Sequence, residues 1–337
     1  NKGVTNMSPF EKRMKDLQAI NVTTKKPADF EKFWNDAKKN VAEKKLTVKK
    51  KKIDYPIEKV EVYEVLFDGL DGTEICSFLI LPPEAKIKKV PAVLFCHGAT
   101  GSKGLPHMYS THTLMGMAVL AIDYRMQGGK TGSASGFGEG PISIATLGIL
   151  DKKTYYFYHA ITDAFRALRF LKSLDCIDSK RIAVEGGSQG GGTVLTLAGL
   201  DPDLKLCLAD VPSMCWMEKR VYDGSGGARE IAQFIRRRPE NKEKVFETLS
   251  YFDNLNFAPK IKCFTLISCG LSDPVCPPEN VYAVYNKIKA PKKICSYWFG
   301  EHDGGAHLHA DVKIQYLKNI LFNRRVTNNN DCYRNYM

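Results

Sequence analysis

The chain has 337 residues, of which 44% are hydrophobic, and this length and composition exclude a disordered or collagen-like protein. It carries 49 Lys and Arg against 37 Asp and Glu, a formal net charge of +12. Most of this excess of positive charge lies in residues 1–60, which contain the run Lys49–Lys52. Because no recognition motif accompanies this local excess, we expect no nucleic-acid partner. We interpret the lysine run as a solvated linker face, with contact to an acidic partner as the alternative.

The apolar stretches are too short for a membrane helix, which needs roughly 18 to 20 residues, so we expect no membrane partner. The ten cysteines form no C-x-x-C pair and fall mainly inside apolar, strand-like runs. We interpret them as reduced and buried thiols, which favours a cytoplasmic location. A periplasmic or secreted location is the alternative, in case a leader precedes Asn1.

The first part of the chain predicts an arm followed by a hairpin. Residues 9–45 are polar with apolar residues at helical spacing, so we assign 1–52 to an N-terminal helical arm. Residues 53–81 alternate in polarity and contain two Asp-Gly turn signals, which predicts an antiparallel hairpin. This hairpin opens a main domain that we expect to span 53–323.

From Val90 onward, short apolar runs alternate with segments of helical period. The predicted strands cover 90–98, 117–124, 181–188, 205–212, 261–270 and 292–300. The predicted helices cover 155–174, 228–250 and 311–322, with two more beginning at Gly190 and Pro278. Near-continuous apolar strands separated by helices predict an α/β fold, with a mostly parallel central sheet and helices on both faces. The long Gly- and Ser-rich segment 130–153 predicts a functional loop or an oligomer contact, and 324–337 a flexible tail.

The strongest chemical signal is the G-x-S-x-G segment Gly186–Gly190, which lies between a predicted strand and a predicted helix. A nucleophile on such a sharp turn needs neighbours with almost no side chain, which Gly186 and Gly190 provide. We therefore predict that Ser188 is a nucleophile. The alternative is a serine in a turn that merely lets strand and helix pack closely.

A serine nucleophile needs a carboxylate and a histidine, which follow it in that order at strand ends. Asp273 lies just beyond the strand 261–270 and fits the acid, with Asp210 as the competing candidate. His302 lies in the loop before the last helix and fits the base.

For three other histidines we predict no catalytic role. His307 and His309 form an H-x-H pair, but no third metal ligand is spaced near them, so we favour a loop or the first turn of a helix. His97 has apolar neighbours, and we interpret it as a structural or pocket residue. We expect no metal and no cofactor.

The oxyanion of an acyl-transfer intermediate requires two backbone N–H donors. One is supplied by the residue after the nucleophile, here Gln189, and the other by the loop after an early strand. In V-L-F-C-H-G-A-T-G this second donor is Ala99, which follows His97 and Gly98.

Several segments in order resemble the acetyl xylan esterase and cephalosporin C deacetylase family, carbohydrate esterase family seven, over about Pro9 to Phe322. They are D-Y-R-M-Q-G-G (123–129), G-I-L-D-K-K-T-Y-Y-F-Y (148–158), G-G-S-Q-G-G (186–191), A-D-V-P (209–212), T-L-S-Y-F-D (248–253), C-G-L-S-D-P-V-C-P-P (269–278) and H-D-G-G (302–305).

The resemblance implies the α/β-hydrolase fold and carries nucleophile, acid and base onto Ser188, Asp273 and His302. It matches the family's R-G-Q motif to Arg125-Met126-Gln127, so that Arg125 and Gln127 take supporting positions. It also implies a homo-oligomer, a hexamer arranged as a trimer of dimers, in which the loop 130–153 lies at an interface or cavity.

This sequence departs from the family pattern at three positions. Ala99 replaces an aromatic residue, Met126 replaces the glycine of R-G-Q, and Asp303 replaces a glutamate. The backbone donors survive these changes, so we expect hydrolysis to survive, while the missing ring at position 99 enlarges the pocket.

We therefore predict a serine esterase that removes O-acetyl groups from small acetylated saccharides such as xylo-oligosaccharides, and from cephalosporin C, through an acyl-enzyme. The alternatives are a peptidase-like or dienelactone-like α/β-hydrolase, and an inactive homologue that binds carbohydrate.

Overall fold

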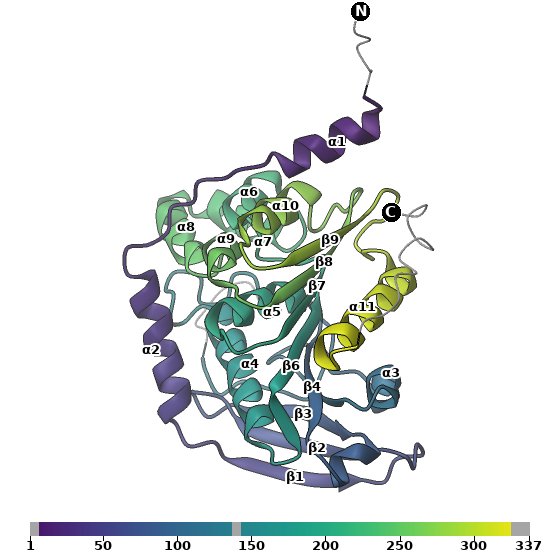
Figure 1. Ribbon diagram of the computed structural model, residues 1–337. Helices are drawn as coiled ribbons and strands as arrows, with labels where there is room; N and C mark the ends of the chain where they lie inside the picture. The colour runs from purple at the N-terminus through teal and green to yellow at the C-terminus, as the bar shows by residue number, and fades with distance from the viewer. Residues whose placement is uncertain (1–6, 137–142, 325–337) are drawn as a thin grey trace, which may run out of the picture.

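The computed structural model describes residues 7–136 and 143–324, and within them the chain builds a nine-stranded sheet between two layers of helices (Figure 1). The strands are β1 (Val48–Ile53), β2 (Glu61–Asp68), β3 (Glu74–Leu81), β4 (Val90–Cys96), β5 (Ala118–Ile122), β6 (Ile177–Gly187), β7 (Leu206–Asp210), β8 (Phe264–Gly270) and β9 (Lys292–Tyr297). The α-helices are α1 (Pro9–Gln18), α2 (Phe30–Glu43), α3 (Ser110–Leu114), α4 (Tyr156–Ser173), α5 (Gln189–Leu200), α6 (Met217–Asp223), α7 (Ala228–Arg237), α8 (Lys242–Ser250), α9 (Asn254–Phe257), α10 (Pro278–Lys287) and α11 (Ala306–Leu321).

The sheet order is β1-β2-β3-β5-β4-β6-β7-β8-β9. The pairs from β5-β4 through β8-β9 are parallel, whereas β1, β2 and β3 pair antiparallel up to β5. The predicted mostly parallel sheet and the predicted hairpin are therefore confirmed. Because parallel strands share one direction, the carboxyl ends of β4, β6, β7, β8 and β9 meet at one edge, where the predicted chemical residues follow them.

Helices cover both faces of the sheet. In Figure 1, α4 and α5 lie on one face and α3 and α11 on the other. The larger apolar core, on the α4 and α5 side, also contains residues of α2, α9 and α10. The second core packs Val312, Leu317 and Leu321 of α11 against strand residues such as Leu208 and Leu266. Strands buried on both faces explain why their sequences are almost continuously apolar.

The lysine run is an edge strand and not the predicted linker. Lys49–Lys52 form most of β1, which pairs antiparallel with β2. Lys49 makes an ion pair with Glu74 of β3 (2.5 Å), and Lys52 makes one with Glu61 of β2 (2.9 Å). Lysines on an edge strand discourage pairing with another chain, and here their acidic partners lie within the same sheet. The sheet thus begins at Val48, inside the segment we assigned to the arm.

Two predicted helices have different bounds in the structure. The segment 228–250 contains α7 and α8, separated at Arg238 and Pro239, because proline disfavours helical backbone at the residue before it. The last helix begins at Ala306, five residues earlier than predicted, so His307 and His309 lie in its first turn, as we expected.

The N-terminal arm packs along the outside of the domain. Phe30, Phe33 and Trp34 of α2 are buried, and the Trp34 indole N–H donates to Tyr251 O (2.9 Å). In α1, Arg13 pairs with Glu279 of α10 (2.5 Å). The arm is therefore joined to the domain by apolar burial as well as by charge.

Among the described residues, none of the helices combines the length and apolar character required to cross a bilayer. Nine of the cysteines lie in the described chain; all are free thiols and all but Cys176 are buried, as predicted. Part of the predicted loop 130–153, residues 137–142, and all of the predicted tail except Arg324 lie outside the described residues.

Candidate active site

Ser188 lies on a sharp turn between β6 and α5, in the backbone conformation φ 55°, ψ −115°. Such a conformation is strained for a residue with a side chain. A Cβ added at Gly190 would lie 1.9 Å from Cys96 O, and one at Gly186 2.6 Å from the same atom. The two glycines therefore let the turn approach the end of β4 closely, as the sequence predicted.

The structure brings the three predicted chemical residues together from three separate segments. Ser188 Oγ lies 2.9 Å from His302 Nε2, within hydrogen-bond distance. His302 Nδ1 in turn lies 2.8 Å from Asp273 Oδ2. This hydrogen-bonded chain is the geometry of a nucleophile, a general base and an orienting carboxylate.

Asp273 is held by the loop that follows β8. Its side chain is fully buried, and its Oδ1 accepts from the backbone N–H groups of Val275 (2.7 Å) and Cys276 (2.9 Å). Both oxygens are therefore engaged, which fixes the carboxylate relative to the His302 imidazole. Asp273, Cys276 and His302 lie close enough to hold a metal ion. Both nitrogens of His302 and the Asp273 carboxylate already take part in the hydrogen bonds described above.

The loop after β4 lies against the serine turn, since a Cβ added at Gly98 would be 3.7 Å from Ser188 Cβ. His97 anchors this loop: its Nε2 accepts from Tyr124 N (3.0 Å) and its Nδ1 donates to Gly98 O (2.7 Å). Burial lowers the pKa of His97, consistent with this neutral imidazole and with the structural role we predicted. Within the described chain, the backbone N–H groups of Ala99 and Gln189 donate no hydrogen bond.

Gln127 connects the two segments that carry the predicted oxyanion donors. Its Oε1 accepts from Thr100 N (2.8 Å), and its Nε2 donates to Gln189 Oε1 (3.1 Å) and to the Tyr156 hydroxyl (2.7 Å). The Tyr156 hydroxyl donates to Arg125 O (2.8 Å). Gln127 thus fixes the spacing between residues 99–100 and 189. Tyr156 was not singled out from the sequence, although it lies in one of the segments that carry the resemblance.

Arg125 anchors the loop after β5, which also carries Gln127. Its buried guanidinium forms a bidentate pair with Asp163 of α4 (2.8 and 2.9 Å) and contacts Asp71 in the β2-β3 turn (2.7 Å). Met126 follows it with a positive φ of 57°, so the methionine keeps a left-handed conformation that favours glycine.

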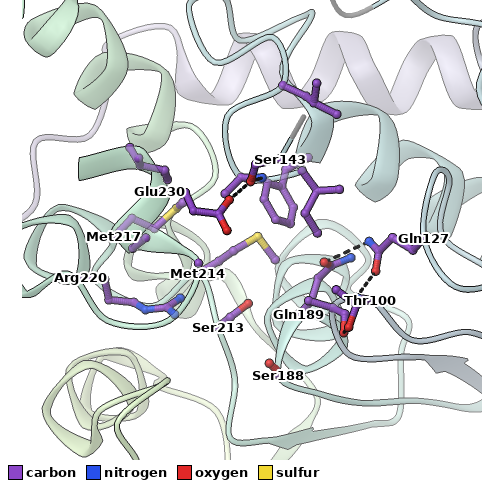
Figure 2. A pocket seen from close by; sticks show the side chains of 18 of the residues that line it. Thr100, Gln127, Ser143, Ser188, Gln189, Ser213, Met214, Met217, Arg220 and Glu230 are labelled. Atoms are coloured by element: carbon purple, nitrogen blue, oxygen red, sulfur yellow. Dashed lines mark hydrogen bonds between the residues drawn. The ribbon is translucent and has the colours of Figure 1, made fainter. Parts of the chain in front are cut away.

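A pocket of about 530 Å³ opens beside Ser188, between the β4 and β5 loops and helices α6 and α7. Figure 2 shows side chains that line it, with Gln127 and Gln189 on one side and Arg220 and Met217 on the other. Most of the remaining lining is apolar and includes Ala99, Met126, Ile144, Ala145, Leu147, Phe157, Met214, Val221, Ile231 and Val275. The pocket has the size of a site for a small molecule.

The competing acid, Asp210, does not reach His302. Its carboxylate contacts Lys313 (2.6 Å) and lies 3.1 Å from His309 Nε2. Its backbone carbonyl accepts from Ser188 N (2.9 Å), so the residue supports the serine turn through its main chain. Of the H-x-H pair, His309 is buried and His307 exposed, and the two do not form a joint site.

The comparisons with known proteins agree on one family. The sequence model of the acetyl xylan esterase family matches residues 7–320. Acetyl esterase Axe7A of Xylanibacter ruminicola is 30% identical over 83% of this chain, which spans 64% of that protein's length. The acetyl xylan esterase from Paenibacillus sp. R4 is 37% identical with a TM-score of 0.88, covering 91% of this chain and 99% of its own. Acetyl xylan esterase 1 from Thermoanaerobacterium sp. JW/SL YS485 is 29% identical with a TM-score of 0.84, covering 90% and 97%. The fold is therefore that of the α/β-hydrolases, and the chain belongs to the acetyl xylan esterase family.

Proposed function

We propose that this protein is a serine esterase that removes O-acetyl groups from small acetylated saccharides, such as xylo-oligosaccharides. The observation that carries the proposal is the hydrogen-bonded chain from Ser188 through His302 to Asp273 at the pocket. Family membership and the acetyl esterases among its relatives support the acyl group. Cephalosporin C, which also carries an acetyl ester, is a second substrate that we propose to test.

In this mechanism, Ser188 attacks the ester carbonyl while His302 Nε2 takes its proton. The Asp273 carboxylate holds the imidazole with Nδ1 protonated and stabilises the imidazolium that forms. The N–H groups of Ala99 and Gln189 bind the oxyanion, at a spacing that Gln127 maintains. Collapse of the intermediate expels the alcohol with a proton from His302 and leaves an acetyl-serine. Water, deprotonated by His302, then releases acetate.

The testing experiment compares hydrolysis of 4-nitrophenyl acetate, butyrate and octanoate by the wild type and Ser188→Ala, with labelling by a fluorophosphonate probe. We expect a preference for acetate, and turnover and labelling that both disappear in Ser188→Ala. Ser110→Ala, a serine outside the pocket, is the matched control and retains both. Acetylated xylo-oligosaccharides then test the alcohol part. A folded wild type that neither turns over nor labels would refute the esterase proposal.

Two finer proposals concern assembly and location. We propose a hexamer built as a trimer of dimers, with the loop 130–153 at an interface or cavity, and sedimentation of the purified protein tests it. The free thiols of the described chain support a cytoplasmic location, with a periplasmic or secreted protein as the alternative.

A further inference from the structure

Arg220 is a buried guanidinium that has no carboxylate partner within residues 7–136 and 143–324. Three arginines of the described chain are buried: Arg125, Arg166 and Arg220. Arg125 pairs with Asp163 and Asp71, and Arg166 pairs with Asp68 (2.7 Å). Arg220, which is 7% exposed, makes no ion pair within the described residues. A buried charge is costly unless it is paired, so this exception points to a missing partner.

The hydrogen bonds of Arg220 leave part of the guanidinium unused. Its Nη2 donates to Val275 O (2.8 Å), whereas its buried Nε has no hydrogen-bond partner in the described part of the chain. Asp253 is a buried acidic residue near Arg220: burial raises its pKa to about 6, and the Arg220 charge opposes that rise. Asp253 accepts from the N–H groups of Trp216 (3.0 Å), Met217 (2.6 Å) and Leu255 (2.9 Å), so its oxygens are occupied. It does not supply the partner that Arg220 lacks.

The unpaired guanidinium lies in the wall of the pocket that contains Ser188. Figure 2 shows it reaching from α6 toward the side of the pocket where Ser213 and Ser188 lie. The lining also contains the apolar side chains of Met217, Val221 and Val275. Its one acidic side chain among the described residues, Glu230, accepts a hydrogen bond from Ser143 and not from Arg220. A guanidinium in such surroundings attracts a planar anion strongly. The low local dielectric increases the electrostatic attraction, and the forked N–H groups of the guanidinium match the two oxygens of a carboxylate.

We propose that Arg220 binds a carboxylate on the alcohol part of the substrate, and that the pocket selects acetyl esters of hydroxy acids, including saccharides that carry a uronic acid. The carboxylate belongs to the alcohol part because the acetyl group carries no charge. The selection of acetyl esters rests on the proposed function, whereas the binding of a carboxylate by Arg220 does not depend on it. A competing explanation is that Arg220 only positions the Asp273 loop through Val275 O.

The test uses two acetyl esters of almost equal shape, 4-acetoxybenzoate and the neutral 4-acetoxybenzamide, with 4-nitrophenyl acetate as a reference. For the wild type we expect kcat/KM to favour the carboxylate by about tenfold or more, mainly through KM, and less at high salt. In Arg220→Gln the ratio of the two values falls to about one. Arg236→Gln, which removes an exposed arginine of α7, keeps the wild-type ratio. No carboxylate preference in the wild type, or an equal loss on both esters in Arg220→Gln, would overturn the proposal, and the equal loss would identify a positioning role.

A binding measurement keeps this test separate from the esterase proposal. Calorimetric titration of Ser188→Ala with 4-hydroxybenzoate and 4-hydroxybenzamide requires no turnover. We expect the acid to bind about tenfold or more tightly than the amide. If the wild type lacks esterase activity but this difference is present and depends on Arg220, the proposed function fails and the anion site stands. Equal binding of the two compounds would refute the site, whatever the activity.

Discussion

Two His–Asp pairs lie near the carboxyl edge of the sheet, and their difference explains which of them can act on a substrate. His302 belongs to the loop after β9, and its side chain is 30% exposed and faces Ser188. His309 lies one helical turn into α11 and is 2% exposed. Its Nδ1 contacts the Tyr297 hydroxyl (3.0 Å), and its Nε2 lies 3.1 Å from Asp210 Oδ1. Because the ring is buried and both nitrogens face protein groups, neither nitrogen is accessible to a substrate.

The carboxylates of the two pairs, Asp210 and Asp273, differ in whether a positively charged side chain neutralises them. Asp210 shares Lys313 with Glu185, so a permanent cation neutralises it. Asp273 has no lysine or arginine partner within the described residues, and its oxygens are held by two backbone N–H groups and by His302. Its charge is therefore available to stabilise an imidazolium when His302 takes a proton. The same two residue types form the pair that we propose to be reactive in one place and a structural pair in the other.

The largest contrast is expected when each histidine is removed in turn. His302→Ala eliminates the base, so kcat for 4-nitrophenyl acetate falls by about 10⁴-fold or more. His309→Ala leaves the Ser188 hydrogen bond untouched, and we expect kcat within about tenfold of the wild type, with a lower melting temperature from the cavity and the unpaired Tyr297 hydroxyl. Comparable losses of kcat in the two variants would contradict the distinction between the pairs.

The Lys313→Met variant tests whether Lys313 compensates the negative charge of Asp210 in the second pair, and the readout is the free energy of unfolding. Lys313 lies 2.6 Å from Asp210 and 2.8 Å from Glu185, and its removal leaves the buried Glu185 and the partly buried Asp210 without their lysine. We expect a loss of about 3 kcal/mol in the free energy of unfolding. Lys318→Met, at an exposed position of the same helix, is the control and changes stability by less than about 0.5 kcal/mol.

The pH dependence of this variant has a predicted sign. Burial alone would raise the pKa of Glu185 and of Asp210. Lys313, together with His112 at Glu185 and His309 at Asp210, outweighs this and holds both pKa values below the usual range. A lowered carboxyl pKa contributes stability that is present above about pH 4.3 and lost as the pH falls below it. Without Lys313 the largest charge that opposes burial is lost, so both pKa values rise. The stability gap between Lys313→Met and the wild type therefore narrows as the pH falls from 7 to 4. Thermal unfolding across this range checks the sign, and a constant gap would refute the account.

The sequence predicted those parts of the site that depend on strand order alone. Ser188, Asp273 and His302 each follow a recognisable apolar strand, and the carboxyl ends of parallel strands meet at one edge. Their convergence could therefore be expected without knowing any packing angle. The glycines at 186 and 190 were predictable for a similar reason, because the turn needs a close backbone approach that the local sequence reveals.

The residues that were missed depend on contacts between distant segments. Lys313 meets Glu185 and Asp210 across 128 and 103 positions, and no local pattern links them. Nothing in the sequence singled out Arg220, because burial of a short helix against a pocket has no sequence signature. The lysine run was wrongly interpreted as a linker, because four consecutive charges hide the alternation that marks a strand, and only pairing with β2 gives them partners.

The smallest effect concerns the contact between the second pair and the loop that carries His302. Tyr297→Phe removes the hydroxyl next to His309 Nδ1, which we expect to cost about 1 kcal/mol of unfolding free energy. The ring remains, and it lies directly beneath Gly305, where an added Cβ would be 2.3 Å from the ring. We therefore expect kcat to stay within about twofold in Tyr297→Phe and to fall in Tyr297→Ala, which removes the support under the loop. If the phenylalanine variant loses as much kcat as the alanine variant, the hydroxyl and His309 contribute to turnover, and the second pair is more than structural.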